Sequence, residues 1–332
     1  MLRKRRLRFW RMIAPRSALI VALAVILISS QGRAAEKITI GTVGQASANL
    51  WPVFIGINQG FYAAEGLDVD IVYVQSSAAL VQQIAAGSLD ICMSTGLADP
   101  IRAVAMGAPI AVLRIEVQAP PYDLLAKPAI KSLNELTGKV ISLGGPKDIT
   151  RIYVERMLAP HGVRPGQYDM VFAGATAARA SALLAGAVDA AILLPPFNFQ
   201  LKAKGFSDLG LTVDYVKDLP FSGTAVNVTW ANAHKDTLEK LLRAHNRSVA
   251  WFADGSNRSQ AVAMLKAASG LSQDDVEKAY DFFRDGNFFE PTGAVSKSKL
   301  TALAEAMRSL GDLPATLDID KVMLPGVTKV TD

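Results

Sequence analysis

Apolar and polar positions along the chain follow two periods, one typical of strands and one typical of helices. From residue 37 onward, short runs rich in Val, Ile and Tyr alternate with longer runs of helical spacing, and most of these longer runs end at a glycine. The first part of the chain carries predicted strands and helices, in chain order strand 37–41, helix 50–65, strand 67–74, helix 78–86 and strand 90–93. This succession predicts a parallel sheet with helices on both faces.

The same succession returns about a hundred residues later. Its predicted elements are, in chain order, strand 138–145, helix 149–159, strand 168–172, a helix to Ala185 and strand 190–194. Residues 84–91 (IAAGSLDI) and 183–190 (LLAGAVDA) share a helix end, a capping glycine and an aspartate that begins a strand. Two such units in one chain predict two lobes of similar architecture.

Two extended segments at 112–126 and 219–230 separate these units, and each contains at least one proline. Two crossings place the ends of the chain in one lobe, so we predict lobe 1 at 35-122 plus 224-332 and an inserted lobe 2 at 123-223. The last part of the chain is predicted to be helical and to support lobe 1, with helices at 235–253, 259–268, 273–283 and 297–310. No pattern is visible from Gly311 onward.

The beginning of the chain differs from the rest. Eight of its 35 Lys and Arg residues lie in the first 35 positions, which contain no Asp or Glu, around an apolar run at 18–28. This order is typical of a secretory signal peptide, and the run is shorter than the roughly 20 residues of a spanning helix. We therefore expect residues 1-34 to be a signal peptide cleaved after Ala34 rather than an anchor.

The formal charge of +5 becomes −3 for residues 36–332, with 27 basic and 30 acidic residues, which argues against a nucleic-acid partner.

Residues suited to catalysis or metal binding are scarce. The single cysteine, Cys92, lies in a predicted apolar strand, where a core role is expected. The histidines are not spaced as zinc ligands. Ser296 and Lys299 fit an SxxK pattern without its companion motifs and are expected to begin a helix. The sequence therefore predicts no catalytic residue, no metal site and no cofactor.

Short polar side chains gather in the loops that follow predicted strands. In open α/β sheets, ligands bind beyond the carboxyl ends of strands, where helix N-termini present N–H groups and partial positive charge. From these loops we predict ligand contacts by Asn49, Ser77, Thr95, Gly145, Thr150 and Thr176. The hydroxyls of Ser77, Thr150 and Thr176 fit N-caps equally well, and one side chain can do both.

Three further residues near the expected cleft have two interpretations each. Arg114, in the first crossing with Tyr122, either pairs with an anionic ligand or forms a salt bridge with Glu116. Phe197 either stacks on the ligand, together with Trp51, or packs in the core. We predict Arg114, Tyr122 and Phe197 as further candidate ligand contacts. Two more arginines begin helices that face the loops, although surface positions are the commoner role for such residues: Arg151 and Arg179.

Four stretches of the chain, taken in order, resemble a known family. They are 59–69 (QGFYAAEGLDV), 85–91 (AAGSLDI), 132–140 (SLNELTGKV) and 185–190 (AGAVDA). With them the chain resembles the periplasmic substrate-binding proteins of ABC importers, specifically the NMT1/THI5-like group that includes sulfonate, nitrate and taurine binders. The resemblance implies a two-lobed α/β fold, the type II periplasmic-binding-protein-like fold, with a mostly parallel sheet flanked by helices in each lobe. The two crossing segments would form its hinge.

The expected function is capture of a small organic ligand, of the sulfonate, carboxylate or N-heterocycle class, for an ABC transporter permease and ATPase. The protein is expected to be a periplasmic monomer that contacts the membrane only through the permease and catalyses no reaction. Two alternatives remain. The same fold would serve a ligand-sensing module presented to a receptor, whereas a secreted enzyme related to thiamin-pyrimidine synthases would need the cysteine-rich iron motif that this chain lacks.

Overall fold

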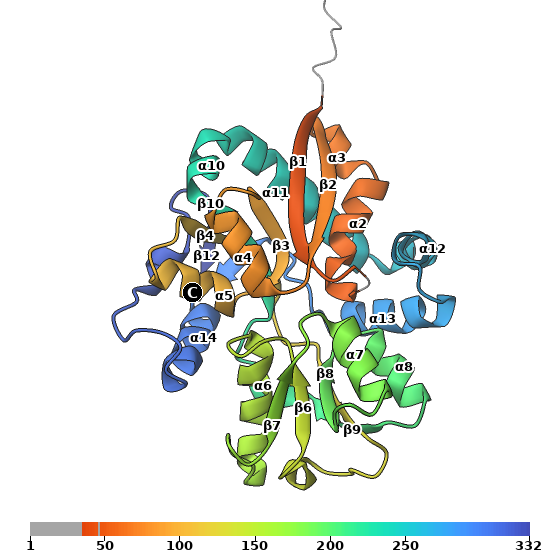
Figure 1. Cartoon of the computed structure of the whole chain (residues 1–332). Helices are drawn as coiled ribbons and strands as arrows, with labels where there is room; N and C mark the ends of the chain where they lie inside the picture. The colour runs from red at the N-terminus through yellow and green to blue at the C-terminus, as the bar shows by residue number, and fades with distance from the viewer. Residues whose placement is uncertain (1–34, 46) are drawn as a thin grey trace, which may run out of the picture. The chain divides into compact units, whose positions relative to one another are not determined.

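The computed structural model describes residues 35–45 and 47–332, so the predicted signal peptide 1-34 lies outside the described residues, as does Ala46. Within the described ranges, no helix is both long enough and apolar enough to cross a membrane. Residues 36–332 form a compact unit containing two five-stranded sheets, one in the upper and one in the lower part of Figure 1.

The first sheet has the strand order β2-β1-β3-β10-β4. Its strands are β1 (Glu36–Val43), β2 (Leu67–Val74), β3 (Ile91–Gly96), β4 (Ile110–Val117) and β10 (Ser222–Asn227). The helices between its strands are α2 (Trp51–Asn58), α3 (Phe61–Ala64), α4 (Ser77–Ala85) and α5 (Ala98–Ala105). β1 runs parallel to β2 and β3, whereas β10 runs antiparallel to β3 and β4.

The second sheet repeats this arrangement as β7-β6-β8-β5-β9. Its strands are β5 (Asp123–Ala126), β6 (Val140–Leu143), β7 (Asp169–Phe172), β8 (Ala190–Leu193) and β9 (Ser207–Leu211). Its helices are η3 (Leu133–Leu136), α6 (Ile149–Leu158), η4 (Ala159–His161), α7 (Thr176–Leu184), α8 (Phe197–Ala203) and α9 (Val213–Val216). β6 pairs parallel with β7 and β8, and β5 pairs antiparallel with β8 and β9. We call the two halves the first and second lobe.

The predicted two-lobed α/β architecture is confirmed, and the sheets are mixed for a clear reason. The strands that are followed by pocket loops run towards the other lobe, and they pair in parallel. β5 and β10 each enter their sheet directly after the chain has crossed from the other lobe, so they run the opposite way. Ser222 and Gly223, which the prediction assigned to lobe 2, pair with β3 of the first sheet. The other lobe boundaries stay predictions.

Two predicted elements end earlier than the apolar pattern suggests. The helix predicted at 50–65 is divided into η2 (Ala48–Leu50), α2 and α3, and Gly60 between α2 and α3 has a left-handed φ of 69° that other residues rarely adopt. The extended run predicted to reach Trp230 stops at Asn227. Its side-chain Oδ1 accepts hydrogen bonds from the backbone N–H groups of Thr229 and Trp230, at 2.9 and 3.1 Å, and so begins α10 (Val228–Ala233).

The C-terminal part is helical, as predicted, and packs mainly on the first lobe. Its elements are α11 (Lys235–Ala253), η5 (Gly255–Asn257), α12 (Arg258–Ser269), α13 (Gln273–Asp285), β11 (Ala294–Ser296), α14 (Lys297–Ser309), η6 (Ile319–Val322) and β12 (Lys329–Thr331). α11 and α12 contact α2, and α14 contacts α5. α13 also reaches the second lobe, where the rings of Phe199 and Phe282 lie 5.8 Å apart. The tail after Gly311 is more ordered than its pattern indicates, because β12 pairs with β11.

Candidate functional site

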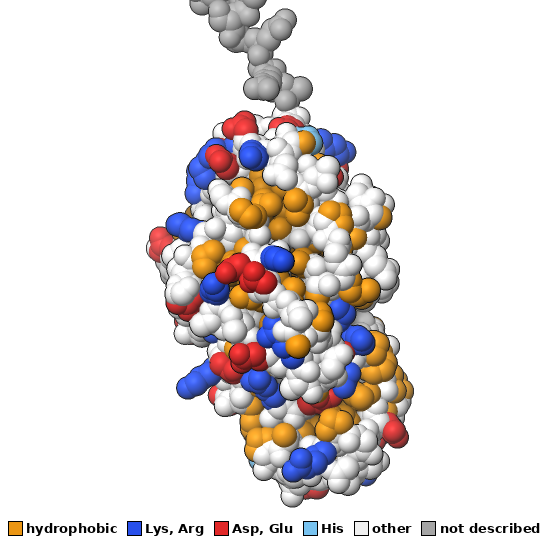
Figure 2. All heavy atoms as spheres, turned by 90° about the vertical axis from the view of Figure 1, so that its left-hand side faces the viewer, with side chains coloured by type: hydrophobic (Ala, Val, Ile, Leu, Met, Phe, Trp, Pro, Cys, Tyr) orange, Lys and Arg blue, Asp and Glu red, His pale blue; other side chains and the backbone are white. Residues whose placement is uncertain are grey.

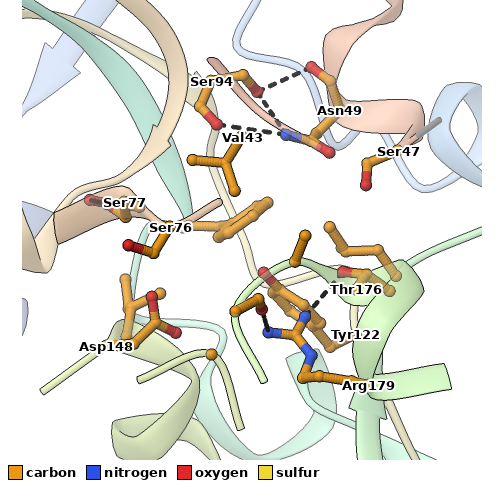
Figure 3. Close-up of a pocket in the computed structure, with 17 residues that line it drawn as sticks. Val43, Ser47, Asn49, Ser76, Ser77, Ser94, Tyr122, Asp148, Thr176 and Arg179 are labelled. Atoms are coloured by element: carbon orange, nitrogen blue, oxygen red, sulfur yellow. Dashed lines mark hydrogen bonds between the residues drawn. The ribbon is translucent and has the colours of Figure 1, made fainter. Parts of the chain in front are cut away.

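A pocket lies between the two lobes, where the predicted loops of both sheets meet (Figure 3). The space between its lining residues that no atom fills is about 500 Å³, and this volume includes solvent at its open mouth. The first lobe contributes Val43, Ser47, Asn49, Ser76, Ser77, Ser94 and Gly96. The second lobe and the crossings contribute Tyr122, Gly144, Asp148, Ile149, Gly174, Ala175, Thr176, Arg179, Leu194 and Phe221.

Asn49 and Ser94 form the most closely connected part of the first-lobe wall. The Asn49 side-chain Nδ2 donates to the Ser94 hydroxyl at 2.8 Å and to the Ser94 carbonyl at 3.3 Å, and the Ser94 hydroxyl donates to the Asn49 carbonyl at 2.9 Å. Ser94 has a left-handed φ of 58°, which is uncommon for a residue other than glycine. These reciprocal bonds hold the end of β3 in that conformation and fix the Asn49 amide beside the pocket.

Ser77 lines the pocket, but it is not the N-cap of α4. That role belongs to Ser76, whose hydroxyl accepts from the Ala79 backbone N–H at 3.2 Å. The Ser77 hydroxyl lies 2.8 Å from the Thr95 hydroxyl instead. Thr95 is fully buried and does not reach the pocket surface, so it supports Ser77 from behind.

The second-lobe loop after β6 is organised by Asp148. Its carboxylate accepts from the Thr150 backbone N–H at 2.9 Å, which makes Asp148 the N-cap of α6. The Thr150 hydroxyl donates to the same carboxylate and accepts from the Gly144 N–H at 3.0 Å. Thr150 is therefore buried behind the loop and does not line the pocket, while Gly145 lines a neighbouring hollow.

Arg179 is the cation of the pocket, and it is 97% buried with 3% of its surface exposed. Its guanidinium donates to the Gly174 carbonyl at 2.9 Å and to the Thr176 hydroxyl at 2.7 Å, and it lies 5.7 Å from the centre of the Tyr122 ring. Burial raises the pKa of the Tyr122 phenol. Within the described residues, Arg179 has no carboxylate in ion-pair contact, although a cation removed from water ordinarily needs one.

Two further predicted site residues lie away from the pocket. Arg114 lies outside the pocket, in β4, and its Nε is 3.2 Å from a Glu116 carboxylate oxygen, the salt bridge that was its alternative interpretation. The imidazole Nε2 of His245 lies 2.8 Å from the other Glu116 oxygen. Burial by itself would raise the pKa of Glu116, but Arg114 and His245 outweigh it and lower the pKa to about 2. Phe197 begins α8 and packs against the second-lobe core, and Trp51 is fully buried beside Phe252, so neither aromatic ring lines the pocket.

The lobes also touch beside the pocket. Arg102 of α5 donates to the Lys147 carbonyl of the second lobe at 2.6 Å and to Asp99 at 2.6 Å, and the Lys147 ammonium lies 3.4 Å from Asp312. Burial, and after it the charge of Asp148, raises the pKa of Asp99 to about 6. These contacts hold the two lobes together at the rim of the site.

Several pocket residues were not selected from the sequence. Ser94, Asp148 and Arg179 line the pocket from within or beside predicted loops, where the sequence pattern does not distinguish a pocket residue from a surface residue. Phe221 comes from the second crossing, directly after Pro220, where the pattern indicates a linker rather than a wall. For Arg179, the sequence offered one indication of a site role: it is a cation near the start of a helix that follows a predicted strand.

Solved structures share this two-lobed α/β fold, which is the periplasmic-binding-protein fold. The alkanesulfonate-binding protein SsuA from Xanthomonas axonopodis pv. citri, bound to MOPS, has a TM-score of 0.74 at 17% identity, covering 88% of this chain and 99% of that one. The periplasmic nitrate-binding protein NrtA from Synechocystis PCC 6803 has a TM-score of 0.73 at 17% identity, covering 87% and 86%. A mutant of DSZB in complex with biphenyl-2-sulfinic acid has a TM-score of 0.62 at 14% identity, covering 88% and 97%.

The family follows from the sequence comparison. The model of the NMT1/THI5-like family matches residues 47–277, and the chain belongs to that family. This confirms the resemblance seen in the four sequence stretches. Comparison with curated protein sequences gives no match.

Proposed function

We propose that the protein captures a small organic molecule of the sulfonate, carboxylate or N-heterocycle class in the cleft between its lobes and delivers it to an ABC transporter. Membership of the NMT1/THI5-like family supports this proposal, as do the names of the alkanesulfonate- and nitrate-binding proteins that share the fold. The partners would be the ligand, the permease and its ATPase. The protein would act as a monomer and touch the membrane through the permease alone.

The observation that carries the proposal is the buried Arg179 in the second-lobe wall of a pocket built from both lobes. The first turns of α4, α6 and α7 border the same pocket, and helix N-termini favour negative charge. A ligand held by both walls stabilises the closed form by its difference in affinity for the closed and open forms. The segments 118–122 and 212–221, which join the two sheets, are the proposed hinge.

Other functions have less support. Cys92 is buried in β3, and burial raises the pKa of its thiol to about 12, so it is a poor nucleophile. Among the described residues no group of three His, Cys, Asp or Glu side chains is placed to hold a metal. On the face shown in Figure 2, Lys and Arg side chains are mixed with Asp and Glu, without the continuous basic stripe typical of nucleic-acid binding. We therefore propose a binding protein without a reaction of its own.

The proposed location is the periplasm, reached after cleavage of the signal peptide 1-34. Intact mass of the exported protein tests this part, because cleavage after Ala34 leaves a chain that begins at Ala35. A mass that includes the first 34 residues would contradict it. A sensor that presents the bound state to a receptor shares every feature of the pocket, and co-purification with a permease and ATPase distinguishes the importer from it.

A thermal-shift screen of residues 35–332 tests the proposed function directly. The panel comprises small sulfonates, carboxylates and N-heterocycles, with inorganic sulfate and a neutral sugar as controls. A ligand at about 100 times its Kd adds roughly 2.7 kcal/mol to the free energy of unfolding, which is several degrees in Tm. For a compound that shifts Tm, small-angle scattering is expected to show a smaller radius of gyration. Absence of any shift across the panel would contradict the proposal.

A further inference from the structure

The orientation of the Asn49 amide is fixed by its neighbours. The Ser94 carbonyl can only accept hydrogen bonds, so the Asn49 atom 3.3 Å from it must be the NH₂ nitrogen and not the oxygen. The same nitrogen donates to the Ser94 hydroxyl at 2.8 Å, and that hydroxyl in turn donates to the Asn49 carbonyl. Both N–H groups of the amide therefore have acceptors, and the side-chain oxygen Oδ1 is on the opposite side.

This oxygen faces the pocket without a partner. Asn49 is 96% buried with 4% of its surface exposed, and no described residue donates a hydrogen bond to Oδ1. Figure 3 shows Oδ1 turned away from Ser94 and towards the space between the lobes. A buried acceptor left without a donor lowers the stability of whatever state contains it. The first-lobe wall thus presents one oriented acceptor to the ligand.

The second-lobe wall presents the opposite polarity. Arg179 is 97% buried, and its Nε, like Asn49 Oδ1, is a buried atom without a hydrogen-bond partner among the described residues. Asp148 and Arg179 are the charged residues among those that line the pocket, so its side-chain charges sum to zero. A fully anionic ligand would satisfy Arg179 but leave Asn49 Oδ1 unpaired.

We propose that Asn49 is a specificity-determining residue, and that the ligand carries two features: an anionic group that faces Arg179 and an N–H or O–H donor that faces Asn49 Oδ1. This inference rests on the proposed function and deepens it by naming the ligand class. We expect anions without a donor, such as nitrate or a plain alkyl sulfonate, to bind at least about tenfold more weakly than donor-bearing acids. A tenfold difference in Kd corresponds to about 1.4 kcal/mol. The walls therefore select an amino-, amido- or hydroxy-substituted acid.

The test compares four sulfonates of the same chain length by calorimetry on residues 35–332. They are ethanesulfonate, 2-hydroxyethanesulfonate, 2-aminoethanesulfonate and 2-(trimethylammonio)ethanesulfonate. Propanoate, 3-hydroxypropanoate and 3-aminopropanoate repeat the comparison with a carboxylate. The hydroxy compounds add a donor without adding charge, and the trimethylammonio compound adds charge without a donor. The comparison within the wild-type protein decides the question even where a variant does not fold.

The expected result is that both donor-bearing compounds of a series bind at least about tenfold more tightly than the compound without a donor. In Asn49→Leu, which has a similar volume but no acceptor, this difference falls below about threefold. Asn58→Leu, the same substitution at an exposed residue of α2 outside the pocket, retains the difference. Circular dichroism checks that each variant is folded.

Three results would overturn the inference while leaving the proposed function intact. In the first, ethanesulfonate or propanoate binds the wild type as tightly as its donor-bearing counterparts. In the second, the difference in affinity persists in folded Asn49→Leu. In the third, the amino and trimethylammonio compounds bind equally tightly, and the hydroxy compounds bind no more tightly than the compounds without a donor. The ligand would then be selected by the charge of Asp148 and not by the Asn49 acceptor. If no sulfonate or carboxylate binds, the anionic class named in the proposed function fails, and the inference fails with it.

Discussion

Arg114 and Arg179 are two buried arginines, one in each lobe, and their surroundings differ. Arg114, 1% exposed, has the Glu116 carboxylate at 3.2 Å and the Asn246 side chain in hydrogen-bond contact. Arg179, 3% exposed, has a carbonyl and a threonine hydroxyl as hydrogen-bond partners and the Tyr122 ring at 5.7 Å, and no carboxylate among the described residues is in ion-pair contact with it. A buried cation whose charge is compensated within the protein stabilises the fold, whereas one without a carboxylate is placed to meet an anion from outside. The partners of an arginine, rather than its presence near a cleft, indicate its role.

The largest expected effect comes from removing the Arg179 cation, which has no carboxylate in ion-pair contact among the described residues. Arg179→Met should weaken binding of an anionic ligand by about 10- to 100-fold, because hydrogen bonds to a charged group contribute about 1.5–3 kcal/mol. The matched control is Arg151→Met, since Arg151 also begins a helix of the second lobe but pairs with Glu155 at 2.7 Å outside the pocket. Calorimetry with the tightest sulfonate or carboxylate gives both values. Equal losses in the two variants would remove the distinction between paired and unpaired arginines.

The opposite pattern is expected at the compensated arginine. Glu116→Gln leaves Arg114 buried without its carboxylate and should lower the free energy of unfolding by about 3 kcal/mol, while the folded protein binds ligand within about twofold of the wild type. Denaturant unfolding and calorimetry measure the two quantities separately. A large loss of affinity with unchanged stability would place Arg114 in the binding site after all.

Acid provides a second measure of the same pair. The pKa of Glu116 is lowered from 4.5 in the unfolded chain to about 2 in the folded protein, so its charged form stabilises the fold. That contribution is complete above pH 4.5 and is lost as the pH falls from 4.5 towards 2. The free energy of unfolding of the wild type should therefore decrease more steeply over this range than that of Glu116→Gln. Parallel curves would mean that Glu116 is not the acid-sensitive group.

The fold was more predictable from the sequence than the site. Glycine-capped helices and β-branched runs are local signals, and they located strands such as β2 and the long helix α11 within a residue or two. The antiparallel entry of β10 was not predictable locally, because it depends on where the chain returns from the second lobe. The same limit applies to Arg114, whose partner Asn246 is 132 positions away in the sequence.

Two threonines of the second lobe give a smaller contrast. Thr176 lines the pocket and supports Arg179, so Thr176→Ala should weaken binding several-fold with little change in stability. Thr150 lies behind the loop and accepts from the Gly144 N–H, so Thr150→Ala should lower stability by about 1–2 kcal/mol and change affinity less than threefold. Thermal unfolding and calorimetry on both variants check this. Equal effects of the two substitutions on affinity would show that Thr150 also contacts the ligand.

The smallest expected effect concerns pH and the rim of the pocket. The pKa of Asp99 is raised to about 6, so this carboxyl gains its charge as the pH rises from 5 to 7. The added negative charge beside the first-lobe wall should weaken binding of an anion about two- to threefold over that interval. Asp99→Asn should remove the change. A pH dependence that persists in Asp99→Asn would assign it to another group.

The most direct test of the account is a crystal structure of residues 35–332 with the tightest-binding sulfonate or carboxylate. The account predicts that an oxygen of the anionic group lies within hydrogen-bond distance of the Arg179 guanidinium, about 2.7–3.2 Å, with both lobes in contact with the ligand. An anionic group bound elsewhere, with Arg179 still paired only to Gly174 and Thr176, would contradict the account.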